Sequence, residues 1–103
     1  MGRPELLLLD EPFAGLDLGA RERLLTRLSR LAGSGDSPPL VLVTHHAEEI
    51  PIGITHAAVI SAGRFVAAGP IKDACTSDAL SAAYGLQIEV DFDGNRWSAR
   101  AAR

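Results

Sequence analysis

Two short runs of apolar residues stand out in the first half of the chain, and each stops at polar residues. The first run is Leu6–Leu9 and the second is Leu40–Thr44. Runs this short, ended by charge or proline, are typical of strands buried on both faces. A buried helical turn is the alternative for the first run, but Pro12 disfavours helix at the residue before it. We therefore predict two strands.

The segment between the two strands changes to a helical period. Its apolar residues keep the spacing of one helix face within residues 18–32. Asp17 stands where an N-cap would be, and Gly33 follows the last apolar position. Strand, helix and strand in this order predict a βαβ unit, in which the two strands run parallel and are joined by a right-handed crossover.

The second half of the chain is patterned as hairpins and short helices. We expect one helical turn at 47–50, hairpins at 57–68 and 86–98, and short helices at 70–75 and 77–84. Ser77 is expected to cap the second of these helices. The predicted fold class is therefore α/β, with a βαβ unit followed by β-hairpins and short helices.

Composition narrows the function classes. The chain has 103 residues, 47% hydrophobic and 22% charged, with a formal net charge of −3, which argues against a nucleic-acid module that binds by charge alone. No apolar run approaches the roughly 20 residues of a membrane span, and Met1–Pro4 does not lead into the apolar stretch of a signal peptide. The single cysteine, Cys75, excludes an internal disulfide and a cysteine-based zinc site.

Polar residues with chemical capability follow both predicted strands. Asp10 and Glu11 end the first strand and His45 follows the second. Because the carboxyl ends of parallel strands share one edge of a sheet, we expect these three residues to lie along that edge. An aspartate at a strand tip suits a water-bound magnesium ion, and a following glutamate can accept a proton from water. The competing interpretation is that two strands simply end at solvent.

Three motifs in order resemble those of ATP-binding-cassette (ABC) ATPases. Leu6–Pro12 is similar to their Walker B motif, Ala14–Asp17 to their D-loop, and Val41–His45 to their H-loop. The resemblance covers residues 4–69 and is loose beyond Ile71. It implies a partial P-loop NTPase-like sheet in residues 1–70, as the C-terminal part of a nucleotide-binding domain, and a helical and hairpin extension in residues 71–103.

The resemblance also implies a role for each matched residue. Asp10 would bind the magnesium ion of Mg-ATP, Glu11 would act as general base, and His45 would contact the γ-phosphate and the attacking water. The D-loop residues would cross a dimer interface and sense the second nucleotide site; they are Ala14, Gly15, Leu16 and Asp17. His46 departs from the acidic residue common after this histidine, and Glu48 and Glu49 supply negative charge nearby.

Other motifs of the family do not occur in these 103 residues. A P-loop needs Gly-x-x-x-x-Gly-Lys-Ser/Thr, but the only lysine, Lys72, has no glycine directly before it. A signature motif and a recognisable Q-loop are missing as well. We therefore expect the chain alone to be inactive as an ATPase. A truncation, a split protein and a fragment remain open, and an apolar sheet edge and face are expected to lie uncovered.

The resemblance implies that the chain is the C-terminal portion of an ABC transporter ATP-binding subunit. The parent protein would couple Mg-ATP hydrolysis to membrane transport, as a cytoplasmic subunit held at the membrane by transmembrane partners. Further expected partners are a second ABC ATPase domain and the N-terminal half of its own domain, and no nucleic acid is expected. The alternatives are a non-transport ABC ATPase acting in repair or translation, and a non-catalytic remnant.

Overall fold

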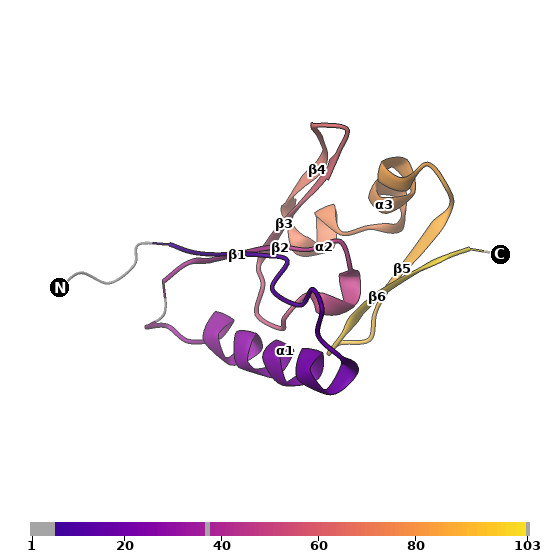
Figure 1. Cartoon of the computed structure of the whole chain (residues 1–103). Coiled ribbons are helices and arrows are strands. Elements are labelled where there is room, and N and C mark those ends of the chain that lie inside the picture. The colour runs from indigo at the N-terminus through magenta and orange to yellow at the C-terminus, as the bar shows by residue number, and fades with distance from the viewer. Residues whose placement is uncertain (1–5, 37, 103) are drawn as a thin grey trace. The chain divides into compact units, whose positions relative to one another are not determined.

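The computed structural model describes residues 6–36 and 38–102, so the expectation about Met1–Pro4 lies outside the described residues. The chain divides into two compact units, of which the first ends at Gly53 and the second begins at Ile54. Figure 1 shows the helices and strands of the chain, coloured by residue number. The boundary expected between residues 1–70 and 71–103 comes from the family resemblance and not from compactness. It stays a prediction.

The first unit is a β-α-β unit with parallel strands. Strand β1 (Leu7–Asp10) pairs with strand β2 (Leu40–Val43), with Leu7 opposite Leu40 and Asp10 opposite Val43. Helix α1 (Leu18–Ala32) connects the two strands and lies alongside them (Figure 1). A single 3₁₀ turn, η1 (Ala47–Glu49), follows β2. The βαβ prediction is confirmed, with each strand placed within one residue of its expected bounds.

One face of the β1–β2 pair packs on α1 to form a small core. Buried Phe13, Leu25 and Leu28 form its centre, and the partly buried residues packed against them are Leu9, Leu24 and Leu42. Phe13 lies in the loop after β1 and is only 3% exposed. It therefore fastens the segment after β1 to the helix.

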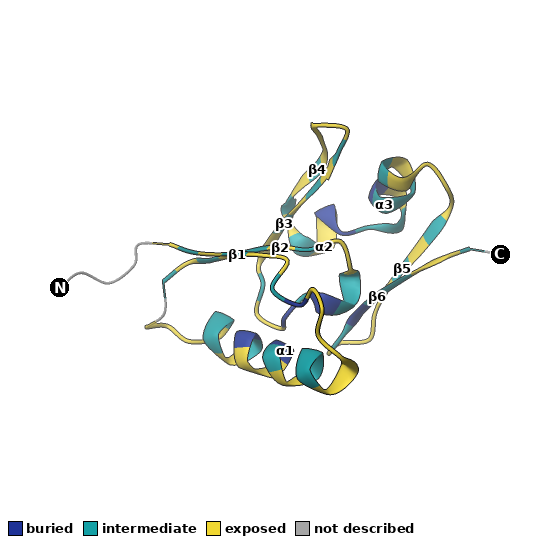
Figure 2. Cartoon of the chain, in the orientation of Figure 1, coloured by how far each residue is buried: buried dark blue, intermediate teal, exposed yellow. Residues whose placement is uncertain are grey.

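The other face of the same strand pair lies open, so the strands are buried on one face only. The expectation that an apolar sheet face lies uncovered in this chain is confirmed. Both strands alternate between half-buried and exposed residues (Figure 2). Leu8 is 60% exposed, and its partner in the register, Val41, is 42% exposed. The physical reason is that α1 supplies apolar cover to one face only.

The ends of α1 agree with the sequence. The Asp17 side chain accepts a hydrogen bond from the backbone N–H of Ala20 at 2.8 Å, which satisfies one of the unpaired donors of the first turn. The helix stops at Gly33, whose φ of −84° is right-handed. Gly33 therefore ends the helix without the left-handed turn that glycine often provides.

The second unit begins with a hairpin and a short helix. Strand β3 (His56–Ser61) pairs antiparallel with strand β4 (Arg64–Pro70), with a register shift between Val59 and Ile60. Ala62 and Gly63 both have positive φ, 52° and 75°, as a tight two-residue hairpin turn requires. Helix α2 (Ile71–Ala74) follows directly and packs on both strands.

A second helix and hairpin complete this unit. Helix α3 (Ser77–Tyr84) precedes strand β5 (Ile88–Phe92), which pairs antiparallel with strand β6 (Trp97–Ala101). Helix α3 ends at Gly85, which is left-handed at φ 72°. That turn leaves Leu86 outside β5, although the sequence predicted that this hairpin begins at residue 86.

The predicted cap of α3 is wrong by one residue. The side chain of Thr76, not of Ser77, accepts the backbone N–H of Ala79 at 3.1 Å. Ser77 Oγ instead accepts the backbone N–H of Val90 at 2.9 Å. One turn further along, Ser81 Oγ accepts the N–H of Ile88 at 2.8 Å and donates to the Ile88 carbonyl at 3.2 Å. Two serines thus hydrogen-bond α3 to the backbone of β5.

Candidate functional site

Glu11 and His45 meet at the carboxyl ends of β1 and β2. Their side chains form a contact in which His45 Nε2 lies 3.1 Å from Glu11 Oε1. The parallel register produces this contact, because Asp10 and Val43 are paired and Glu11 and His45 follow them along the chain. The two side chains are 44% and 73% exposed, so a ligand in solvent can reach both.

The backbone of Glu11 adopts an unusual conformation. Its φ is 50°, in the left-handed region that non-glycine residues rarely occupy, and Pro12 follows it. Its N–H donates to the Val43 carbonyl at 2.8 Å and its carbonyl accepts from the N–H of Ala14 at 3.2 Å. These bonds hold the turn, and the turn directs the Glu11 side chain toward His45. Strain of this kind is found where surrounding structure over-determines a residue, often at functional sites.

Asp10 lies at the same edge as the Glu11–His45 pair. It is the last residue of β1 and is exposed, on the open face that also carries Leu8. Within the described residues, no three His, Cys, Asp or Glu side chains are grouped to hold a metal by themselves. One or two carboxylates without further protein ligands suit magnesium, which keeps several waters and binds phosphate oxygens. The donor set therefore fits a magnesium ion that keeps most of its water ligands.

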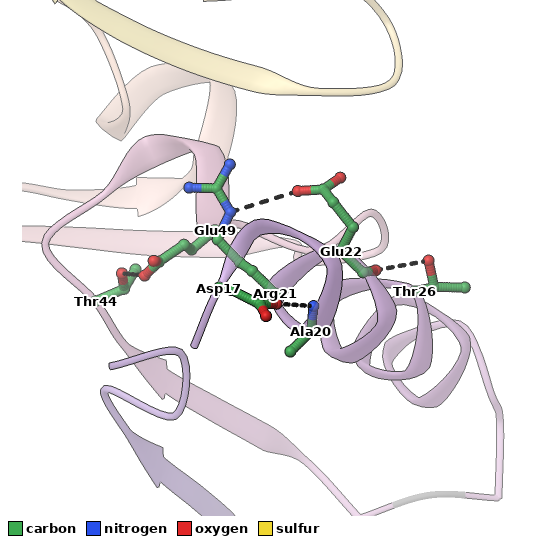
Figure 3. A network of polar contacts seen from close by, with 7 residues as sticks. All are labelled: Asp17, Ala20, Arg21, Glu22, Thr26, Thr44 and Glu49. Atoms are coloured by element: carbon green, nitrogen blue, oxygen red, sulfur yellow. Dashed lines mark hydrogen bonds and ion pairs between the residues drawn. The ribbon is translucent and has the colours of Figure 1, made fainter. Parts of the chain in front are cut away.

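The candidate D-loop is an exposed turn between β1 and α1. Ala14, Gly15, Leu16 and Asp17 are all exposed, while the preceding Phe13 is buried. Gly15 has φ 80°, and the Leu16 N–H donates to the Phe13 carbonyl at 3.1 Å. Asp17 has a structural task here, since it caps α1 through Ala20 (Figure 3). Residues 14–17 are therefore exposed to solvent, while the buried Phe13 side chain fixes the start of the loop.

Two residues that sequence reasoning gave no specific role organise the segment after β2. The Thr44 hydroxyl donates a short hydrogen bond to the Glu49 carboxylate (Figure 3) and accepts one from the His46 N–H at 3.1 Å. Glu49 is 8% exposed. The sequence treated Glu49 only as negative charge near His46, because a hydrogen bond across a 3₁₀ turn has no signature in residue spacing.

The second unit contains a buried thiol. Cys75 is 7% exposed, and burial raises the pKa of its thiol above the ordinary value. A raised pKa keeps the thiol protonated near neutral pH, so Cys75 is a poor nucleophile. Cys75 is therefore a small residue of the core.

Comparison with solved structures gives the class of fold. The chain matches a solved ABC transporter in an inward-facing conformation, with a TM-score of 0.78 and 22% sequence identity. The match covers 96% of this chain and 40% of the other. The chain therefore has the fold of part of an ABC transporter. No helix in the described part of the chain has the length and apolar character needed to cross a membrane.

Sequence relatives identify the family. The chain is 41% identical over 96 residues to the uncharacterized ABC transporter ATP-binding protein YlmA of Bacillus subtilis, covering 93% of this chain and 36% of YlmA. It is 37% identical over 92 residues to the hemin import ATP-binding protein HmuV of Roseobacter denitrificans, covering 87% and 34%. No protein-family model matches the chain. The chain belongs to the family of ABC transporter ATP-binding proteins, and it spans about a third of the length of these curated relatives.

Proposed function

We propose that the chain supplies the water-activating edge of an ABC ATPase site, within a transporter subunit that couples Mg-ATP hydrolysis to transport. The observation that carries this proposal is the contact between Glu11 Oε1 and His45 Nε2 at 3.1 Å, placed at the carboxyl edge of a parallel strand pair. Ligands of α/β proteins bind at this edge. Family membership supports the same location, because the pair falls in the segments that resemble the Walker B motif and the H-loop.

Each residue of the edge has a distinct task in this proposal. Asp10 binds the magnesium ion, which supplies charge neutralisation of the phosphates when bound. Glu11 is the general base that orients and deprotonates water, and His45 hydrogen-bonds the γ-phosphate and the same water. The short distance between Glu11 and His45 lets one water contact both side chains. Positioning of this kind is the main work of a protein in phosphoryl transfer.

The remaining parts of the chain serve assembly in this proposal. The exposed turn Ala14–Asp17 contacts a second ATPase domain, where it senses the other nucleotide site. The open apolar face of β1–β2 packs on the other parts of the nucleotide-binding domain. Residues 71–103 form an extension after that domain. The assembled subunit binds transmembrane partners at the cytoplasmic face of the membrane, in line with the transport names of its relatives.

A chimera tests the proposal directly. The segment of HmuV that aligns with this chain is replaced by the chain itself, so that HmuV contributes the rest of its domain. We expect magnesium-dependent ATP hydrolysis that falls at least ~100-fold in Glu11→Gln while ATP binding is retained, because loss of a general base typically costs about 10²–10⁴ in rate. His45→Ala should fall as well, and the exposed control Asp78→Asn should not.

Two results would contradict the proposal. One is a chimera that binds ATP but hydrolyses it no faster in the parent than in Glu11→Gln. The other is steady magnesium-dependent hydrolysis by the purified 103-residue chain, since these residues contain no P-loop to bind the phosphates. A chimera that binds ATP and never hydrolyses it would favour the non-catalytic alternative.

A further inference from the structure

We propose that Thr44 and Glu49 are positioning residues for His45. They hold the backbone on both sides of this histidine and so direct its ring at Glu11. This inference rests on the proposed function, because the orientation of His45 matters for catalysis only if the site acts on a nucleotide. The geometry itself can be tested without any nucleotide.

Three hydrogen bonds close a ring around the segment that carries His45. The His46 N–H donates to Thr44 Oγ1 at 3.1 Å, and the Thr44 hydroxyl donates to a carboxylate oxygen of Glu49. The Glu49 N–H then donates back to the His46 carbonyl at 3.0 Å. His46 is thus held at both its N–H and its C=O, and Thr44 is held through its side chain. His45 is the residue between these two fixed points.

The position of His45 gives these hydrogen bonds a role in orienting it. Strand β2 ends at Val43, so His45 lies beyond the β1–β2 ladder and is not oriented by strand pairing. Its side chain is 73% exposed, so packing constrains the imidazole weakly. The backbone that carries His45 therefore contributes to the direction of its side chain. The conformation of His46, with φ −128° and ψ 120°, is extended and leads from His45 directly into η1.

The burial of Glu49 explains why its hydrogen bond to Thr44 matters. Glu49 is 8% exposed, and a buried carboxylate is costly unless hydrogen bonds satisfy it; the Thr44 hydroxyl provides one. The same hydroxyl has its lone pair directed at the His46 N–H. Removing either side chain therefore breaks the connection between β2 and η1, on opposite sides of His45.

The decisive variant removes both partners together. Thr44→Val/Glu49→Met replaces the hydroxyl and the carboxylate by apolar groups of similar size, which avoids leaving one buried polar group unpaired. Thr44→Ser keeps the hydroxyl and is the matched control. In the full chain, NMR measures contacts between the His45 ring protons and the Glu11 side chain. Hydrogen exchange of the Glu11 amide, which donates to Val43 at 2.8 Å, reports whether β1 and β2 remain paired.

We expect Thr44→Ser to keep both the NMR contacts between the His45 imidazole and the Glu11 side chain and the protection of the Glu11 amide. The double variant should keep the protected Glu11 amide, lose the His45–Glu11 contacts, and exchange the His46 amide about 10-fold faster, as loss of one hydrogen bond implies. Contacts of undiminished intensity in the double variant would overturn the proposal. So would loss of Glu11 protection in the double variant, since Thr44 and Glu49 would then hold the sheet rather than direct the histidine. Loss of the contacts in Thr44→Ser would overturn it as well.

These outcomes are independent of the proposed function. A chain that passes the NMR test while the HmuV chimera fails to hydrolyse ATP would have an oriented His45 without catalysis. A catalytic chimera whose His45 stays in place without Thr44 and Glu49 would refute the positioning role alone.

Discussion

His45 and Glu11 face each other across the ends of two parallel strands, with Nε2 and Oε1 3.1 Å apart. The two residues reach this contact by different means. Glu11 gets its direction from a left-handed turn after β1, whereas His45 follows a segment held by side-chain hydrogen bonds.

The left-handed backbone of Glu11 should cost stability. Glycine adopts φ 50° without a steric penalty, whereas alanine does not. We therefore expect Glu11→Gly to be more stable than Glu11→Ala by about 1 kcal/mol, since both lose the carboxylate and only alanine keeps the strain. Urea unfolding of the two variants gives the difference. Equal stabilities would mean that the turn relaxes and stores no strain.

The open face of β1–β2 should promote association between chains. Leu8 and Val41 are neighbours in the register and are 60% and 42% exposed. Exposed apolar surface on a strand pair recruits other chains. Replacing both by threonine keeps strand propensity and should raise the concentration at which the chain associates, as light scattering measures. Leu18→Thr removes an apolar residue that is 69% exposed on α1, and it should change association little.

The turn of the second hairpin should become less stable in acid. Asp93 Oδ1 accepts the N–H groups of Arg96 at 2.7 Å and Asn95 at 2.8 Å, and these bonds lower the pKa of the Asp93 carboxyl. Its folded pKa therefore lies below its unfolded pKa. The resulting stability is fully present above the unfolded pKa and is lost as pH falls through the folded one.

Thermal unfolding between neutral pH and about pH 2 measures this loss. Asp93→Asn removes the titrating carboxyl, so its midpoint should depend less on pH than that of the parent chain. Asp91→Asn controls for the loss of one negative charge from the same hairpin. A parent profile and an Asp93→Asn profile that run parallel through the acid range would contradict the prediction.

The hydrogen bonds of Ser81 and Ser77 to β5 should contribute unequally to stability. Ser81 makes two hydrogen bonds to Ile88 and Ser77 makes one to Val90. Truncation leaves half-buried backbone groups unpaired, at roughly 1–3 kcal/mol for each group. Ser81→Ala should therefore destabilise the second unit more than Ser77→Ala, as urea unfolding would measure. Thr26→Ala, at an exposed hydroxyl on α1, is the control for the measurement. A larger loss of unfolding free energy in Ser77→Ala than in Ser81→Ala would contradict the prediction.

Much of the fold was predictable because its elements are locally encoded. The period of the leucines and the Asp17 cap place α1 at its observed bounds, and the two apolar runs give β1 and β2. The order strand, helix, strand then fixes parallel pairing. The meeting of Glu11 and His45 follows from that pairing. What these residues do to a nucleotide stays a prediction.

The rest depends on the tertiary context. The strands β1 and β2 are covered on one face only, because an apolar run shows which residues can be buried, not what is present to cover them. The cap of α3 is Thr76 and not the predicted Ser77, because the Ser77 hydroxyl accepts a hydrogen bond from Val90, thirteen residues away. Likewise, neither the left-handed turn at Glu11 nor the bond between Thr44 and Glu49 has a local sequence signal.

The parallel pairing of β1 with β2 also has a kinetic consequence. Leu7 pairs with Leu40, so the chain must close a long loop before this ladder gains any stability, whereas β3 and β4 close through a two-residue turn. Hairpins form in about 1–10 µs, and non-local pairings form later. The Glu11–His45 edge should therefore assemble last on folding. Pulse-labelled hydrogen exchange should protect the amides of β3 and β4 before that of Glu11, and simultaneous protection would mean that the chain folds as a single unit.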